Sequence, residues 1–472
     1  MGGEPNLSLR PAESAKRVRA PWAGRSKKLA EFAAQTQWED VPEPVQRHTK
    51  LVLLDTLGVI LAGAERPEVR QLRERLAGTA GTGATVYARG WPSYDPRTAA
   101  LLNGIAGRSI ELCEGLRLVS GQAAMQVLPG VLAVGEHARS PGRELLAAFL
   151  LGYDVAGRLA GGFTPRPLAH QNGQVSLLAA AVAGARLRGL DTSGISRAMR
   201  IATILLLTPS YTNAVAGATT LNVAGGMSGF AAALAPELAL AGFEAQDDAI
   251  EEALGNLVGS AFSSDGVLNE LGTRWEITRN YLRLYACCNP IHPALDCLRE
   301  ALAELRPSPD QIERVDVATY RFASVMRNPD PPNYFASKYS LPHAAAVMVV
   351  KGNAGFAELD DAAVKDPVIA ALRHRVHVAE DPAMSAVAPR LRPARVTLTL
   401  ADGRQVTKAC DSHRGDFLRP FSEAEIRAKF GELAGVVLTP EGVSRMEDAV
   451  ERCEDWKSID ELTGLLRRHG RP

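Results

Sequence analysis

The sequence predicts a mostly α-helical protein in which a smaller α+β domain interrupts a large helical domain. Over the first half of the chain, apolar residues recur at spacings of three and four, as in helices with one buried face. Later segments alternate apolar and polar residues, which is the period of a strand. The helical period then returns near the C-terminus. We therefore expect a helical domain over 28–271, completed by 401–472, and an α+β lid domain over 272–400.

Size and charge limit the class of protein. With 472 residues, the chain is long enough for two or more domains. Its 53 basic residues balance 53 acidic ones, so charge gives no reason to expect nucleic acid or an anionic membrane as partner. Residues 1–27 are polar and basic and lack the apolar core of a secretory signal, which predicts a flexible tail. No uncharged apolar run of membrane-spanning length is found, so we expect a cytoplasmic protein without a membrane span.

The helical half is expected to be tightly packed. Leu51–Gly63 is apolar nearly all round except at Asp55, which is typical of a helix buried in a bundle. Alanine-rich and glycine-rich helices follow, and little strand is expected before residue 270. These further helices are expected over Ala99–Ala106, Val127–Glu136, Glu144–Leu159, Ser176–Leu187, Ile195–Leu207 and Thr220–Leu240.

The second half contains the strand candidates. They are expected over Gln311–Thr319, around Val376 and Val378, and over Arg395–Leu400, with a helix over Leu341–Val350 between them. Ser422, with Glu425 three residues later, predicts a capped helix that runs to Phe430.

The stretch Leu284–Leu298 (LYACCNPIHPALDCL) gathers chemically useful side chains in a short span. Two prolines bracket His292, which predicts the start of a helix, with His292 and Asp296 on one face. A helix N-terminus beside Arg283 is suited to binding a carboxylate. The alternative is a buried helix start with two core cysteines.

Cysteine spacing favours neither a disulfide framework nor a metal site. Six cysteines are few for this length, Cys287 and Cys288 are adjacent, and no CxxC pair occurs. A thiol enzyme using Cys287 or Cys288 stays an alternative, since a helix N-terminus and Arg283 could lower a thiol pKa.

Eight segments in order resemble the MmgE/PrpD family, which includes 2-methylcitrate dehydratase, cis-aconitate decarboxylase and iminodisuccinate epimerase. They are LVLLDTLGVILAG, AALLNGIAGRSIE, LPGVLAVGE, LLGYDVAGRL, ARLRGLD, YACCNPIHPALD, ASKYSLPHAAA and HRGDFLRPFSEAEIRAKF, within residues 28–435. The resemblance implies a homodimer with an active site between helical domain and lid, and no metal or organic cofactor. It also implies proton abstraction next to a carboxylate, followed by loss of water or carbon dioxide, or by reprotonation. Such chemistry needs a base and groups that stabilise negative charge.

Several family positions have changed in the helical domain. Glu111 stands where the family has an aspartate, and Gln122 stands close to where it has a histidine. The resemblance makes Glu111 a catalytic carboxylate, and the alternative is that Glu111 and Glu114 form a solvated helix end. His170 matches a family histidine ahead of a glycine-rich helix start and is the leading acid/base candidate, with a structural histidine as alternative.

Other changes remove positive charge. Thr219 replaces a family lysine, Asn222 replaces a histidine, and Cys288 stands where the decarboxylase has a histidine. Arg283 often corresponds to lysine, and it can hold a carboxylate but does not deprotonate. His292 is the shared histidine of its segment.

In the lid, His343 takes the place of a tyrosine found in many members. Lys338 and Tyr339 are expected to line the cleft, the alternative being the exposed face of a lid helix.

The resemblance implies a cofactor-independent lyase acting on a small carboxylate or carbonyl compound. The changed residues predict a substrate less anionic than methylcitrate or cis-aconitate, since each charge-assisted contact is worth about 1.5–3 kcal/mol. We expect His170, His292 and Arg283 to converge in a crevice between the domains. An isomerase, epimerase or cyclase of the same fold, or a catalytically silent binding subunit, stays open. The expected catalytic residues are His170, His292, His343 and Glu111, and the expected binding residues are Arg283, Gln122, Thr219, Asn222, Lys338, Tyr339 and Cys288.

Overall fold

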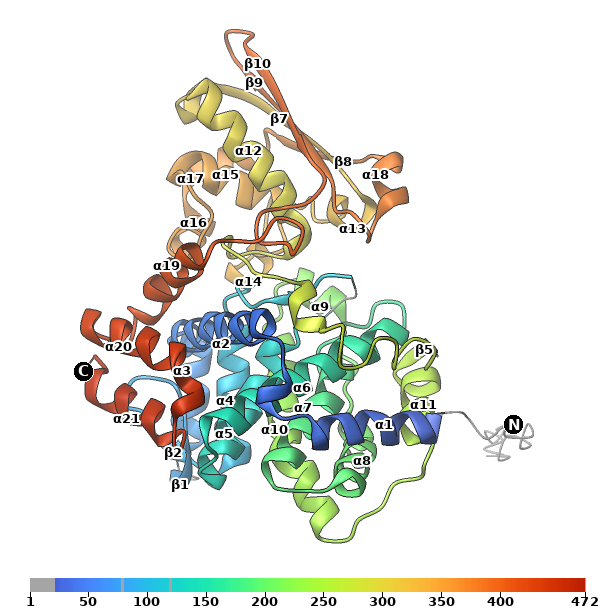
Figure 1. Ribbon diagram of the computed structural model, residues 1–472. Helices are drawn as coiled ribbons and strands as arrows, with labels where there is room; N and C mark the ends of the chain where they lie inside the picture. Colours follow the sequence, from blue (N-terminus) through green and yellow to red (C-terminus); the bar gives the residue numbers. More distant parts are fainter. Residues whose placement is uncertain (1–21, 78–79, 119–120, 472) are drawn as a thin grey trace, which may run out of the picture.

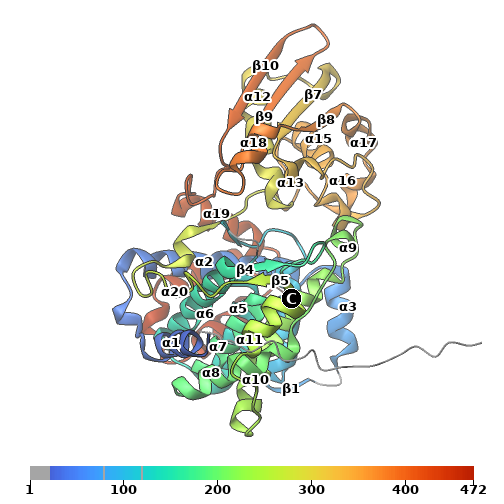
Figure 2. The same ribbon diagram turned by 90° about the vertical axis from the view of Figure 1, so that its right-hand side faces the viewer.

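The computed structural model describes residues 22–77, 80–118 and 121–471, so most of the expected tail over 1–27 lies outside the described residues. The predicted fold class is confirmed. A large helical body carries a smaller α+β lid, and the chain returns to the body through α19, α20 and α21 at its C-terminal end (Figure 1). Turning the molecule shows the lid standing over one side of the body (Figure 2).

The elements of the body come from both ends of the chain. Its helices are α1 (Trp22–Gln35), α2 (Glu43–Gly63), α3 (Pro67–Arg75), α4 (Pro96–Arg108), α5 (Ala124–Ala138), α6 (Gly142–Gly162), α7 (Val175–Leu187), α8 (Thr192–Ile201), α9 (Tyr211–Val215), α10 (Leu221–Leu240), α11 (Ala249–Glu252), α19 (Glu423–Ala434), α20 (Pro440–Glu451) and α21 (Asp460–His469). Its strands form short antiparallel pairs, β1 (Ala80–Thr85) with β2 (Ser93–Tyr94), β3 (Gly115–Leu116) with β6 (Asn280–Tyr281), and β4 (Phe163–Pro165) with β5 (Gly259–Phe262).

The lid is built on one mixed sheet. Its strands are β7 (Ile312–Thr319), β8 (Val376–Glu380), β9 (Ala394–Leu400) and β10 (Gln405–Cys410), in the order β10-β9-β7-β8, with only the β7–β8 pair parallel. The long helices α12 (His292–Leu305) and α15 (Leu341–Lys351) pack against this sheet (Figure 1). Its short helices are α13 (Arg321–Ser324), α14 (Tyr334–Ser337), α16 (Asp361–Lys365), α17 (Pro367–Arg373) and α18 (Pro382–Val387).

The boundary between the domains differs from the expected residues 272 and 400. The segment before Arg283 packs on the body, where the Glu276 backbone N–H donates to Asp154 at 2.8 Å and β6 pairs with β3. At the other end, β10 extends the lid to Cys410 because it pairs along its length with β9. The pairing of β6 with β3 joins residues far apart in the sequence and so leaves no local period, whereas β9 and β10 form a local hairpin.

Helix α2 shows how the body tolerates a charge in its core. Asp55 is 1% exposed, and its carboxylate lies 2.7 Å from Lys429 Nζ on α19. Lys429 also donates to the carbonyl of Leu112 at 2.9 Å. Asp55, the charged residue within the apolar stretch Leu51–Gly63, therefore links α2 to the C-terminal helix α19 through an ion pair.

Two body helices within the described residues are long and apolar enough to cross a membrane by length and composition. They are α6 and α10, and 89% and 61% of their most apolar stretches are buried inside the protein. A core helix passes the same test, so the two helices are weak evidence for a membrane span.

Candidate active site

A buried charged cluster lies where the lid meets the body. Glu111, just after α4, accepts hydrogen bonds from Arg108 on one oxygen and from Arg283 on the other, the latter at 2.6 Å. Arg108 also donates to the hydroxyl of Tyr339 at 2.8 Å, and Arg283 donates to the hydroxyl of Tyr281 at 3.2 Å. All five side chains are at most 4% exposed. The cluster therefore joins α4, β6 and the lid in one network.

Glu111 is held in this position by both backbone and charge. Its φ of +55° lies in the left-handed region that side chains other than glycine rarely adopt. Burial opposes ionisation of its carboxyl, but the charges of Arg108 and Arg283 outweigh that effect and lower the pKa of Glu111 to about 2. The carboxylate is therefore ionised, and each of its oxygens accepts a hydrogen bond from an arginine. These contacts favour a role in positioning the two arginines and offsetting part of their charge. The alternative of a solvated helix end for Glu111 and Glu114 is wrong, because both are buried.

Aromatic rings connect this cluster to His170. The imidazole stacks on Tyr211, with ring centres 5.7 Å apart and planes 11° apart, and Tyr211 meets Tyr339 edge-on at 6.2 Å. The backbone N–H of Asn172 donates to Nδ1 of His170 at 3.2 Å. This bond requires an unprotonated Nδ1, so the neutral ring carries its proton on Nε2. Burial lowers the pKa of His170 to about 3, which keeps the ring neutral.

Close helix packing brings the start of α10 to this cluster. A Cβ at Gly104 would lie 2.7 Å from the Cα of Gly226, and one at Gly229 would lie 2.9 Å from the carbonyl oxygen of Ala100. Helices α4 and α10 therefore run antiparallel in close contact. Arg108 at the end of α4 then lies near the first turn of α10, which carries Asn222.

Several buried polar atoms of this region have no partner among the described residues, and they include neutral amides and the Nε atoms of Arg108 and Arg283. Asn172 and Asn222 are each at most 1% exposed, and neither side-chain atom of either residue has a partner among the described residues. Gln122, 7% exposed, likewise leaves its Oε1 unpaired there. Since buried polar groups are normally hydrogen-bonded, several unpaired amides point to a ligand that completes them.

Gln126 shows that these amides belong to one junction. Its Oε1 accepts from the backbone N–H of Gly173 at 2.8 Å and from Ser228 on α10 at 2.9 Å, and its Nε2 donates to the carbonyl of Gln122 at 2.7 Å. One side chain thus connects α5, α10 and the turn between His170 and α7.

On the lid side of the cluster, the histidines His292 and His413 are hydrogen-bonded. His292 begins α12, as the prolines predict, and its Nε2 donates to the carbonyl of Cys287 at 3.1 Å, the same carbonyl that Arg283 reaches at 3.2 Å. His413 packs against it with ring centres 5.2 Å apart, accepts from Asn289 at 2.7 Å and donates to the carbonyl of Arg414 at 2.6 Å. These bonds favour a structural role for His292.

His170 and His292 therefore lie on opposite sides of one network. Burial is the largest cause of the lowered pKa of each ring, and Arg283 adds a smaller lowering effect to both. His170 is held by the body and His292 by the lid, and their convergence on Arg283 stays a prediction.

Three expected site residues lie apart from this network. Thr219 is exposed ahead of α10. His343 is fully buried in the lid, where neither ring nitrogen has a partner among the described residues, and burial lowers its pKa to about 3. Lys338 is buried rather than on an exposed helix face, its Nζ donates to the carbonyl of Leu359 at 2.6 Å, and burial lowers its pKa to about 7.

The cysteines are poorly suited to nucleophilic chemistry. Burial raises the pKa of Cys288 to about 12, and burial also raises the pKa of Cys287. Neither thiol is therefore a thiolate at neutral pH, which argues against the thiol enzyme. Cys288 lies beside the hydroxyl of Tyr211 at the inner wall of the cluster.

Sequence reasoning missed several residues of the cluster. Arg108, Asn172, Tyr211 and Tyr281 were not singled out, and Glu114 was considered only as part of a solvated helix end. Burial raises the pKa of Glu114 to about 7, although Tyr153 and the N-terminus of α5 donate to it. The one available signal was the i, i+3 spacing of Arg108 and Glu111. Among the described residues, no group of three or more His, Cys, Asp or Glu side chains is placed to hold a metal ion.

A helical body and an α+β lid that share a buried cluster at their junction define a class of two-domain protein. The chain belongs to the MmgE/PrpD family: its residues 27–266 match the MmgE/PrpD N-terminal domain and residues 285–455 match the C-terminal domain. The family is one of lyases that act on small carboxylates.

Similar proteins include distant cis-aconitate decarboxylases. The one from Aspergillus terreus (strain NIH 2624 / FGSC A1156) is 22% identical over 480 residues, covering 94% of this chain and 96% of its own. Those of Mus musculus and Homo sapiens are each 24% identical, covering 89% and 90% of both chains respectively.

Proposed function

We propose that the protein is a cofactor-independent lyase that removes a proton next to a carbonyl group and eliminates water or carbon dioxide from a neutral or singly charged substrate. One observation carries the proposal. Near His170, Glu111 offsets one of the two guanidinium charges of Arg108 and Arg283, which leaves one excess positive charge, and the amides Asn172 and Asn222 have no side-chain partner among the described residues.

Charge balance supports a weakly anionic substrate. Arg283 and Arg108 share the carboxylate of Glu111, so the cluster can balance one substrate carboxylate, and any further carboxylate would have to compete with a buried ion pair. Breaking such a pair leaves an uncompensated buried charge, which costs about 3–5 kcal/mol. Amides instead offer both donors and acceptors to hydroxyl, carbonyl or amide groups.

His170 is assigned the role of hydrogen-bond and proton donor. Its Nε2–H donates to none of the described residues, and the neutral ring can stabilise a carbonyl oxygen that becomes enolate-like as the proton leaves.

Elimination from simple hydroxy compounds tests this function. Dehydration of 3-hydroxybutanamide would give a conjugated amide that absorbs in the ultraviolet, and 3-hydroxybutanoate, cis-aconitate and 2-methylcitrate serve as increasingly anionic comparisons. We expect elimination from the amide, less from the monoacid, and loss of both in a His170→Ala variant. Turnover of either tricarboxylate at rates normal for the family would overturn the proposal.

Isomerase or cyclase chemistry begins with the same proton removal and would appear as exchange of the substrate proton for deuterium without elimination. A catalytically silent binding subunit is less well supported. A binding role gives no reason for the neutral imidazole of His170, whose Nε2–H has no partner among the described residues, to lie near amides that also lack partners there.

We also propose a homodimer. Leu168, Ile204 and Leu257 are 70%, 75% and 65% exposed, and they come from neighbouring segments. The Arg166 side chain donates to the carbonyl of Leu257 at 3.0 Å, which joins the first segment to the third. Such apolar exposure is typical of an interaction surface. Light scattering of the protein and of Ile204→Asp tests whether a second copy covers it.

A further inference from the structure

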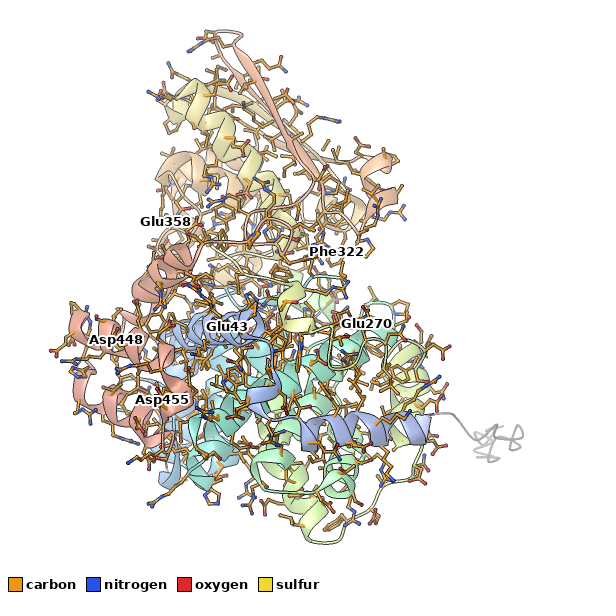
Figure 3. The ribbon with its side chains drawn as sticks, in the orientation of Figure 1. Glu43, Glu270, Phe322, Glu358, Asp448 and Asp455 are labelled. Carbon is orange, nitrogen blue, oxygen red and sulfur yellow. The ribbon has the colours of Figure 1, made fainter. Side chains whose placement is uncertain are left out.

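An apolar cavity of about 470 Å³ opens beside the charged cluster. Its apolar walls come from the lid, through Tyr320, Phe322, Val325 and Pro389, and from the body, through Leu118 after β3. Arg321, Ser385 and Arg392 supply the polar part of the lining. Phe322 marks its place at the junction of lid and body (Figure 3). Phe322 and Val325 are 45% and 59% exposed, although large apolar side chains are usually buried. The cavity is of the size that proteins use to bind small molecules.

Aromatic contacts link this cavity to His170. The ring of Phe322 lies 5.6 Å from that of Tyr211, which in turn stacks on His170 at 5.7 Å. Phe322 and Tyr211 therefore form a continuous aromatic contact between the cavity and the proton donor.

Tyr320 forms a second link. It is 4% exposed and its hydroxyl has no partner among the described residues. Cys288 and Tyr281 of the charged cluster are near enough to influence its pKa. A buried unpaired hydroxyl on the wall of an apolar cavity is suited to the polar part of a ligand whose apolar part fills the cavity.

We infer that this cavity binds an apolar substituent of the substrate, an aryl group or a short alkyl chain attached to the carbonyl compound that reacts at His170. The inference rests on the proposed function and adds the substrate class to it. The charged cluster has one excess positive charge, which is too few for a polyanion, and the cavity provides apolar surface that would add affinity without further charge. Burial of one aryl group is enough to change affinity at least about tenfold.

Binding of two amides tests the inference without requiring turnover. Calorimetric titration with 3-phenylpropanamide should give a Kd at least about tenfold lower than titration with propanamide. The substitution Val325→Asp should remove most of that difference, because it places a charge at the cavity wall. Val325→Leu should keep it.

Val368→Asp is the matched control, since Val368 is also on the lid and 50% exposed but does not line the cavity. It should bind both amides like the unmodified protein. Equal affinity for the two amides, or an equal loss in Val325→Asp and Val368→Asp, would overturn the inference. Selective binding of 3-phenylpropanamide without elimination from 3-hydroxybutanamide would leave the inference standing and count against the proposed chemistry.

Discussion

The two sides of the charged cluster differ in how completely their polar groups are paired. On the lid side, His292 donates to the carbonyl of Cys287, and His413, which is in ring contact with it, accepts from Asn289. On the body side, Asn172 and Asn222 have unpaired side chains among the described residues. Because an unpaired buried polar group costs stability, the body side is the side built for a ligand, and the lid side is the rigid frame that holds Arg283.

Lowering the pH should give the largest change in stability, because it affects buried histidines on both the body side and the lid side of the charged cluster. Burial lowers the pKa of His170 to about 3 and of His413 to about 4, so both rings stay neutral in the fold while the unfolded chain protonates them below about pH 6.5. The unfolded state then binds more protons. Stability should be complete above about pH 6.5 and fall by about 1.4 kcal/mol per pH unit for each ring as the pH drops towards the folded pKa. Urea unfolding at several pH values measures this fall.

Glu114 acts in the opposite direction and must be included. Burial raises its pKa to about 7, so its contribution is complete below its ordinary pKa and is lost as the pH rises through 7. The histidines outnumber it, and the net change on acidification should still be a loss. A His413→Asn variant should lose less between about pH 6.5 and pH 5. Stability that did not change over that range would contradict neutral buried histidines on either side.

Removing the shared carboxylate should give the next largest effect. Glu111→Leu would leave Arg108 and Arg283 buried without a counter-charge, and we expect a loss of about 3–5 kcal/mol in the free energy of unfolding. The control is Glu270→Gln, because Glu270 is 64% exposed at its side chain and pairs with Arg274 at 2.7 Å on the surface (Figure 3). That variant should change stability by less than about 1 kcal/mol. Similar losses in the two variants would mean that the cluster does not hold the domains together.

The sequence predicts the elements of this molecule better than the pairing at its site. Helical and strand periods locate α2, α10, β7 and β9, because each buries one face of a regular element. The Ser422 capping box is confirmed for the same reason, since it depends only on local spacing. The return of residues before Arg283 to the body depends on pairing with β3 far along the chain, which no local period reports.

Pairing within the site is equally non-local. His292 and His413 are in ring contact although more than a hundred residues separate them in the sequence. Nothing in either segment predicts that contact. Resemblance to the family singled out Glu111 and Asn222. That Glu111 is hydrogen-bonded and that Asn222 has no side-chain partner among the described residues depends on neighbours that only the folded chain provides.

A smaller loss of stability is expected when a hydrogen-bonded histidine on the lid side alone is replaced. His413→Ala removes bonds to Asn289 and to the carbonyl of Arg414 and leaves both groups buried, which should cost about 1–3 kcal/mol. His170→Ala on the body side removes only one hydrogen bond, from the Asn172 backbone, and should cost less while abolishing elimination. Urea unfolding and the elimination assay on both variants separate the two roles. A larger stability loss at His170 than at His413 would reverse the assignment of frame and ligand side.

The smallest effect has the opposite sign and is the sharpest test of the comparison. Asn222→Leu replaces a buried amide that has no partner among the described residues with an apolar side chain of similar size, so unfolding should become harder by about 1 kcal/mol. Asn103 is the matched control, because it is equally buried but accepts from the Tyr87 backbone at 2.9 Å and donates to the Thr85 carbonyl at 3.0 Å. Asn103→Leu should therefore destabilise by about 1–3 kcal/mol. If Asn222→Leu destabilised as much as Asn103→Leu, the amide would already be satisfied, and the body side would hold no open place for a substrate.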